Sequence, residues 1–246
     1  MSVLRVDRDG AVAVVTLTNP PANAMDAAGL VELAEEVYRL GADPDVGGVV
    51  ITGEGRVFSA GLDLKAITEL DDAGQEALIE ALNRCFLAVY SCPKLVVGAV
   101  NGHAIAGGLI LALCCDVRVV TDAPLRAALA EVTVGVVYPV AAIEVVRHEL
   151  SGAARRRMVL RGEVLDGAGG VALGVFDRVV PHDELLPAAM AEAADTRPPA
   201  GFARIKAQLR APVIAAAGAA LGGRDPLPRP WLGEETFAAA AAALRR

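Results

Sequence analysis

Short apolar runs alternate with helical patterns along the first half of this 246-residue chain, and glycine-containing turns join them. The run Val-Val-Ile-Thr at 49–52 precedes the turn-forming segment 57–64, and the run Leu95–Val100 precedes the pair Gly107-Gly108. Short apolar runs bounded by turn residues are typical of buried strands. Because strands that alternate with helices indicate an α/β architecture, we predict an α/β fold.

Helical periodicity marks the segments between these strands. Leu30, Leu33, Val37 and Leu40 recur at the spacing of a helix that buries one face. The same criterion predicts a second helix over about 74–90, which would separate the two strands.

The start of the chain is β-rich. The stretches 3–6 and 11–17 flank the turn sequence Asp7-Arg8-Asp9-Gly10. Turn residues between two β-rich stretches predict a hairpin. Further along, Val-Arg-Val-Val at 117–120 is expected to be another strand.

The last third of the chain has a mostly helical pattern. One strand is expected near 175–180, a linker-like segment over 222–230, and a terminal helix over 237–246. We therefore expect a core domain of residues 1–190 and a C-terminal helical region of residues 191–246 that takes part in oligomerisation.

The composition argues against several classes of protein. Apolar residues make up 54% of the chain, yet no uncharged apolar run reaches the roughly 18 residues of a membrane span. The net charge of −7 argues against nucleic acid as the main partner. The four cysteines form no CxxC pair, so we expect buried reduced thiols and no metal site. The N-terminus lacks the apolar region of a signal peptide, so a cytoplasmic location is expected.

The two glycine turns suggest chemistry as well as structure. Glycine suits a backbone that turns with positive φ or approaches a ligand closely, as Gly61 and Gly107-Gly108 would. Each turn is expected to open a helix, and a helix start leaves backbone N–H groups without intrahelical partners. Two such starts that face each other would aim two donors at one point, which suits a developing oxyanion.

Three segments occur in a fixed order and spacing. They are Phe58-Ser59-Ala60-Gly61-Leu62-Asp63-Leu64, Ala99-Val100-Asn101-Gly102-His103-Ala104-Ile105-Ala106-Gly107-Gly108 and Cys115-Asp116-Val117-Arg118. Together they resemble the enoyl-CoA hydratase/isomerase (crotonase) superfamily over about residues 3–185. The resemblance implies the crotonase fold, a spiral of ββα units with a C-terminal helical region. It also implies a homotrimer, or a hexamer of two trimers, in which C-terminal helices pack across subunits.

The same resemblance implies a set of site residues. Members of the superfamily bind acyl-CoA thioesters and stabilise an enolate oxyanion with two backbone N–H groups, which by position are the amides of Leu62 and Gly107. Coenzyme A enters as part of the substrate, and no metal or redox cofactor is implied. The family's contacts to coenzyme A fall on Ala22, Ala24, Ala60, Gly61, Asp63, Leu64 and Lys65.

The candidate base is Glu131. Hydratases of the superfamily use two glutamates, and here the first position holds Ile110 while the second holds Glu131. Syn-hydration needs two groups, whereas moving a double bond from β,γ to α,β needs one base that takes a proton and returns it. The local sequence also resembles the Δ3,Δ2-enoyl-CoA isomerase branch, so isomerisation is the favoured expectation. Apolar neighbours such as Val132 and Val134 are expected to raise the pKa of Glu131.

Two alternatives remain open from the sequence. One is a hydratase, or another enolate chemistry, that uses a second carboxylate elsewhere, and Glu144 or Tyr138 are outside candidates for a second group. The other is a non-catalytic acyl-CoA-binding protein with a misplaced Glu131.

Other polar residues are weaker candidates. His103 is expected to serve a turn or packing role. His148 and His182 are expected on the surface, and Glu149 on a solvated charged helix face with Glu144. Arg204 and Lys206 are either ordinary surface charges or contacts to a phosphate of coenzyme A.

Overall fold

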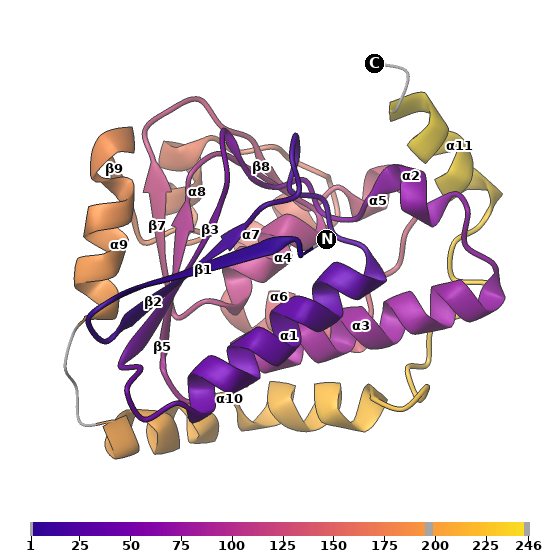
Figure 1. Ribbon diagram of the computed structural model, residues 1–246. Helices are drawn as coiled ribbons and strands as arrows, with labels where there is room; N and C mark the ends of the chain where they lie inside the picture. The colour runs from indigo at the N-terminus through magenta and orange to yellow at the C-terminus, as the bar shows by residue number, and fades with distance from the viewer. Residues whose placement is uncertain (1, 195–198, 244–246) are drawn as a thin grey trace.

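The chain forms two β-sheets enclosed by helices (Figure 1). The computed structural model describes residues 2–194 and 199–243. The large sheet has the order β1-β2-β3-β5-β7-β9, and all its neighbouring strands are parallel except β1 and β2. Its strands are β1 (Leu4–Asp9), β2 (Val12–Leu17), β3 (Gly48–Gly53), β5 (Leu95–Val100), β7 (Val117–Thr121) and β9 (Arg178–Val180). Together with the helices between these strands, the sheet confirms the α/β prediction.

The N-terminal hairpin is confirmed, with a tighter turn than predicted. Asp7, Arg8 and Asp9 belong to β1 and pair with β2, so the turn is limited to Gly10 and Ala11. Gly10 has a φ of +57°, a conformation that favours glycine. The three charged residues fit into a strand because β1 is a mostly exposed edge strand.

A second, smaller sheet was not predicted from the sequence. It consists of three short parallel strands in the order β4-β6-β8. They are β4 (Val57–Ser59), β6 (His103–Ile105) and β8 (Ala127–Ala128). The segment 57–64 begins as strand β4, which was not predicted, and then forms the expected turn before α2.

The two sheets are built by one repeated path of the chain. Each time, a strand of the large sheet is followed by a strand of the small sheet and then by helix. The three units are β3-β4 with α2 (Leu64–Ile67) and α3 (Asp72–Ser91), β5-β6 with α4 (Gly107–Cys114), and β7-β8 with α5 (Glu131–Val134). This repetition is the predicted spiral of ββα units. Because the small-sheet strands are parallel, the residues that follow them emerge at the same edge.

Side-chain alternation along the large sheet separates two apolar cores. Val49 and Ile51 belong to the main core, while Val50 between them packs with the residues of α9 (Leu185–Ala193) on the other face. The same alternation holds on β2, where Ala13 and Val15 face the main core. A helix therefore covers each face of the sheet, as expected for parallel strands.

The remaining helices follow the predicted pattern. The periodic residues around Leu33 form α1, and the second expected helix is α3. The others are α1 (Ala27–Ala42), α6 (Val140–Glu149), α7 (Gly152–Met158), α8 (Gly167–Ala172), the 3₁₀ helix η1 (His182–Glu184), α10 (Pro199–Ala220) and α11 (Glu234–Ala243). The expected terminal helix is α11, and its last predicted residues, 244–246, lie outside the described part of the chain. Residues 225–230 carry no regular secondary structure, in agreement with the linker-like composition.

The C-terminal helices pack on their own chain. In Figure 1, α10 runs along the lower edge, where it contacts α3 and α6, and α11 lies at the upper right against α2 and α5. Residue 190 lies inside α9, which packs on the large sheet. Within residues 2–194 and 199–243, no helix is both long enough and apolar enough to cross a membrane. The four cysteines are buried and free, as predicted.

Candidate active site

A cavity of about 540 Å³ lies at the edge where the strands of the small sheet end. Residues that follow all three strands line it: Leu62 after β4, Gly107 after β6 and Glu131 after β8. Most of the lining is apolar. Its polar side chains, among the residues described, are those of Asn19, Asp63, Glu131, Tyr138 and Thr236.

The two glycine turns predicted from the sequence touch each other. Gly61 has a φ of +83°, and a Cβ atom there would lie 2.8 Å from the carbonyl oxygen of Ile105. A Cβ atom on Gly108 would lie 2.2 Å from the carbonyl oxygen of Ser59. Both contacts are with backbone, which cannot move aside cheaply, so glycine is required at both positions.

Two backbone amides in these turns lack partners. Gly61 and Asp63, on either side of Leu62, both hydrogen-bond to Met25. The Leu62 amide donates to no acceptor in the described chain, and neither does that of Gly107, the first residue of α4. Since both residues line the cavity, these N–H groups are available to a bound oxygen atom.

Ala106 holds the second of these amides in place through an uncommon backbone conformation. It precedes α4 with φ +50° and ψ −124°, a region that residues with a Cβ atom rarely adopt. Such conformations cost on the order of 1–3 kcal/mol and persist where the surroundings enforce them. Here the Ala106 amide donates to the carbonyl oxygen of Ala128, which ties this turn to β8.

Glu131 begins α5 and is buried. The Tyr138 hydroxyl donates a 2.9 Å hydrogen bond to its Oε2 atom. Burial raises the pKa of Glu131 to about 7, against the lowering effect of its own backbone N–H and of Tyr138. A carboxyl group with this pKa can both take up and release a proton near neutral pH. Tyr138 was an outside candidate from the sequence, and the structure brings it to the site.

The position of a second glutamate is apolar, as the sequence indicates. Ile110 lies on α4, is buried and lines the cavity. Leu82, Phe86 and Ala142 lie along the same cavity. Glu144, the other outside candidate, is not among the lining residues; its helix, α6, contributes Ala142 instead, and Glu144 pairs with Arg147.

The residues expected to contact coenzyme A divide into two groups. Gly61 is not part of the lining and shapes the turn behind it, and Lys65 is exposed outside the lining. Asp63 also caps α2, because its Oδ1 atom accepts hydrogen bonds from the amides of Lys65 and Ala66. Those that line the cavity are Ala22, Ala24, Ala60, Asp63 and Leu64.

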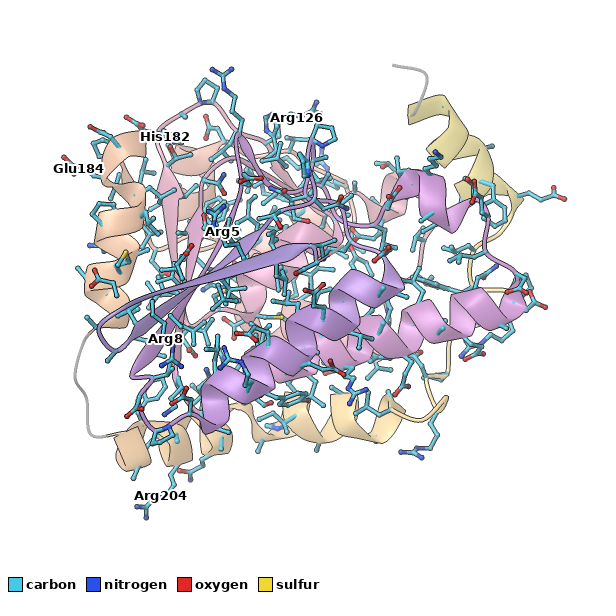
Figure 2. The ribbon with its side chains drawn as sticks, in the orientation of Figure 1. Arg5, Arg8, Arg126, His182, Glu184 and Arg204 are labelled. Atoms are coloured by element: carbon cyan, nitrogen blue, oxygen red, sulfur yellow. The ribbon has the colours of Figure 1, made fainter. Side chains whose placement is uncertain are left out.

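The three histidines lie outside the cavity lining. His103 accepts a hydrogen bond from the Arg126 amide at Nδ1, which agrees with the predicted turn or packing role. His148 lies beside Tyr90, and His182 beside Thr121. In Figure 2, His182 is seen near α9, away from α2, α5 and α11. Within the described chain, no cluster of three or more His, Cys, Asp or Glu side chains is arranged to hold a metal ion.

Two predictions about surface charges were wrong. Lys206 is buried, and its Nζ atom donates to Asp116 Oδ2 at 2.6 Å, so it is not available to a phosphate. Glu149 is also largely buried and pairs with Arg118 at 3.3 Å. The sequence did not reveal these pairs because their partners lie far away along the chain. Arg204 is exposed and projects from the start of α10, at the opposite side of the view from α11 (Figure 2).

Three described lining residues come from a part of the chain that the sequence analysis did not assign to the site. Trp231 follows the linker-like segment, and Thr236 and Ala239 belong to α11. Trp231 Nε1 donates to the carbonyl oxygen of Val137 at 2.8 Å, and the Thr236 hydroxyl donates to that of Val134. Trp231 is the one tryptophan of the sequence and follows a proline-rich segment. A large aromatic residue in such a segment was the available signal that the segment packs on the core.

Comparison with known proteins gives the same family as the sequence motifs. The family model described as enoyl-CoA hydratase/isomerase matches residues 7–223. A putative enoyl-CoA hydratase of Thermus thermophilus is 37% identical over 186 residues, which are 74% of this chain and 73% of that protein. The mitochondrial enoyl-CoA delta isomerase 1 of Mus musculus is 33% identical over 176 residues, covering 71% of this chain and 61% of that protein.

The fold has close counterparts among solved structures. The crystal structure of human mitochondrial delta3-delta2-enoyl-CoA isomerase superposes with a TM-score of 0.90 and 26% identity, covering 100% of this chain and 98% of that one. The predicted crotonase fold is therefore confirmed. Relatives named hydratase and relatives named isomerase are both present, so their names alone do not select the reaction.

Proposed function

We propose that this chain, which belongs to the enoyl-CoA hydratase/isomerase family, moves the double bond of a 3-enoyl-CoA thioester to the 2-position. Glu131 is the proton-carrying base, and the amides of Leu62 and Gly107 form the oxyanion hole. One observation carries the proposal: Glu131 is the one buried carboxylate among the described residues that line the cavity.

The reaction needs one base and one oxyanion hole. The Glu131 carboxylate takes the proton from C2, which breaks the C2–H bond and places negative charge on the thioester oxygen. The amides of Leu62 and Gly107 stabilise that charge as hydrogen-bond donors. Glu131 then returns the proton to C4 while the double bond moves from C3–C4 to C2–C3. The product has the same atoms as the substrate, so the reaction is an isomerisation with no net gain or loss of a proton.

Ile110 favours this reaction over hydration. Adding water across a double bond requires one group to activate the water and another to hold it or deliver a proton. The aliphatic side chain of Ile110 can do neither. An isomerase gains from this apolar wall, because water near the dienolate could protonate it at the wrong carbon or exchange the proton held by Glu131.

The shape and polarity of the cavity suit an acyl chain attached to a larger polar carrier. Phe86, Leu82 and Trp231 provide apolar surface for the acyl chain. We place the coenzyme A part near residues 60–65, where Gly61 shapes the turn and Lys65 is exposed. The lining residues proposed to contact it are Ala22, Ala24, Ala60, Asp63 and Leu64.

An assay with two substrates tests this function. The purified protein is expected to convert 3-hexenoyl-CoA to 2-hexenoyl-CoA without hydrating crotonyl-CoA. Glu131→Gln should lower kcat by about 10³-fold, as expected for loss of a general base, while acyl-CoA still binds. Glu54→Gln, at an exposed glutamate paired with Arg5 and outside the cavity lining, is the matched control and should leave kcat unchanged.

The same assay can contradict the proposal in two ways. Rapid hydration of crotonyl-CoA would assign a hydratase and refute the argument from Ile110. Tight acyl-CoA binding without turnover of any enoyl thioester would assign a binding protein.

We also propose that the protein assembles as a homotrimer or as a hexamer of two trimers. Val132, Leu160 and Val164 are exposed apolar residues, and the turn at Gly162 brings their segments together. Exposed apolar residues that lie on neighbouring segments are typical of an interface. Light scattering coupled to gel filtration should give three or six chains per particle, and a monomer would contradict this proposal.

A further inference from the structure

Tyr138 lines the cavity beside Glu131. Its hydroxyl contacts Oε2 of Glu131, seven residues earlier in the chain. The other carboxylate oxygen, Oε1, accepts no hydrogen bond from another residue in the described chain. Oε1 is therefore the carboxylate oxygen that no neighbouring residue holds, on a side chain that lines the cavity.

The backbone around Tyr138 is fixed at several points. Gly135, with a φ of +68°, ends α5 and donates to the carbonyl oxygen of Glu131. The Val136 amide donates to the same oxygen. Trp231 Nε1 donates to the carbonyl oxygen of Val137, and Pro139 is the N-cap residue of α6. The tyrosine ring therefore sits between two anchored segments, and its hydroxyl has a defined position.

In the hydrogen bond between Tyr138 and Glu131, the hydroxyl is the donor and the carboxylate is the acceptor. Burial and the negative charge of Glu131 both raise the pKa of the Tyr138 hydroxyl, so it keeps its proton throughout the neutral range. A protonated hydroxyl beside a carboxylate is a donor, and this hydrogen bond favours the ionised form of Glu131.

Resting on the proposed function, we propose that Tyr138 is a positioning residue that holds Oε2 of Glu131 and leaves Oε1 as the oxygen that carries the proton between C2 and C4. A carboxylate free to rotate would offer either oxygen, in many orientations. A carboxylate held at one oxygen presents the other along one direction, which increases the fraction of productive geometries.

Tyr138→Phe tests the proposal because it removes the hydroxyl and keeps the ring. The first measurement is an NMR titration of ¹³C-labelled glutamate side chains in the protein without substrate, with Glu131 assigned through Glu131→Gln. We expect the Glu131 pKa in Tyr138→Phe to be higher than in the wild type by about one unit, because the ionised carboxylate loses a donor. Other titratable groups nearby are Asp63, at the start of α2, and Glu235 on α11, close to Gly135.

The second measurement is the pH profile of 3-enoyl-CoA isomerisation. The acid limb of kcat/KM should move to higher pH by the same amount. At high pH, where Glu131 is ionised in both proteins, kcat should remain about tenfold lower in Tyr138→Phe, with KM within about twofold. A Glu131 titration that does not move overturns the proposal, and so does a plateau kcat equal to that of the wild type.

Tyr90→Phe is the matched control. Tyr90 also donates its hydroxyl to a largely buried glutamate, Glu149 at 2.8 Å, but it is not part of the cavity lining. It should leave the Glu131 titration and kcat unchanged, and thermal unfolding confirms that both variants are folded. If the wild type does not isomerise 3-enoyl-CoA, the proposed function fails, while the NMR titration still reports whether Tyr138 holds Glu131.

Discussion

The amide nitrogen of Gly107 lies 3.1 Å from the point where a Cβ atom on Gly61 would sit. These glycines belong to separate ββα units, yet no side chain fits between their backbones. Direct backbone contact therefore helps to set the relative position of the two unpaired amides, beside the hydrogen bonds to Met25 and Ala128. This contact makes the proposed oxyanion hole rigid and also sensitive to a single methyl group.

Gly61→Ala should lower isomerase kcat by about 100-fold, the scale of losing one oxyanion donor. The added methyl group must displace the backbone of Ile105 or Gly107. Gly55→Ala is the control, because Gly55 has a similar φ of +72° but open space around it. Both variants should lose stability from the positive φ, and only Gly61→Ala should lose kcat. Equal kcat values in steady-state assays of the two variants would refute the contact argument.

The pH dependence of activity should follow Glu131. Because burial places its pKa at about 7, the base is ionised above that pH and protonated below it. We expect kcat/KM to reach a plateau above neutrality and to fall about tenfold for each pH unit below 7. Steady-state rates in constant-ionic-strength buffers from pH 5 to 9 measure this. An acid limb close to 4.5 would mean that Glu131 is solvated in the working enzyme.

The raised pKa of Glu131 also predicts that Glu131→Gln stabilises the fold, although the same substitution removes activity. The unfolded chain has a glutamate pKa of 4.5 and the folded chain about 7. The folded state therefore binds the proton more tightly, so this contribution is fully present below pH 4.5 and is lost as pH rises through 7. Glu131→Gln, which has no charge to bury, should be more stable than the wild type at pH 8 by about 3 kcal/mol.

Urea unfolding of both proteins at pH 4 and pH 8 provides the measurement. The difference between them should be largest at pH 8 and should shrink at pH 4, where Glu131 is protonated in both states. A variant that is less stable than the wild type at pH 8 would contradict the buried-base interpretation.

Asp225 should be important for the attachment of the C-terminal segment. Its buried Oδ2 atom accepts hydrogen bonds from Asn83 Nδ2 at 2.8 Å and from the Val140 amide at 2.9 Å. Asp225→Ala would leave both buried donors unpaired and should cost about 2–3 kcal/mol of unfolding free energy. Chemical denaturation measures this, with Asp183→Ala at an exposed position as control. A loss below about 0.5 kcal/mol would show that the segment is held by its apolar contacts alone.

Ile110→Glu should introduce hydration. A carboxylate at this position of α4 would face the same cavity as Glu131 and could supply the second group that water addition needs. We expect crotonyl-CoA hydration at least about tenfold above that of Ile110→Gln, with a lower melting temperature because a charge is buried. Hydration that stays at the Ile110→Gln level would mean that the cavity lacks more than one glutamate.

The sequence predicted those helices and strands whose apolar pattern extends over enough residues to be recognised. Helix α1 repeats its apolar residues over four turns, and the strands of the large sheet are continuous apolar runs. The strands of the small sheet contain only two or three residues, too few to show a period. Their pairing depends on contacts between separate ββα units, which no local pattern records. The turns at Gly61 and Gly108 could be predicted because the surrounding backbone itself requires glycine at both positions.

The site was predictable where a motif fixed the position and not where contacts between distant segments decide it. The resemblance to the family assigned Glu131 and Ile110 to the site, and both line the cavity. Lys206 looked like a surface charge because lysine usually is one, and only the fold shows Asp116 opposite it. Trp231 is separated from Val137 by almost a hundred residues, so its place in the cavity depended on the path of the chain.

The docking of residues 225–239 has a consequence for the order in which the protein matures. During synthesis the three ββα units emerge first and can pair their strands before this segment exists. Trp231 and Thr236 arrive later and add the last wall of the cavity. A nascent chain can thus hold both glycine turns and Glu131 in place while its cavity is still open to water. The cavity around the proposed base is then completed only when α11 packs against α5, the helix that begins with Glu131.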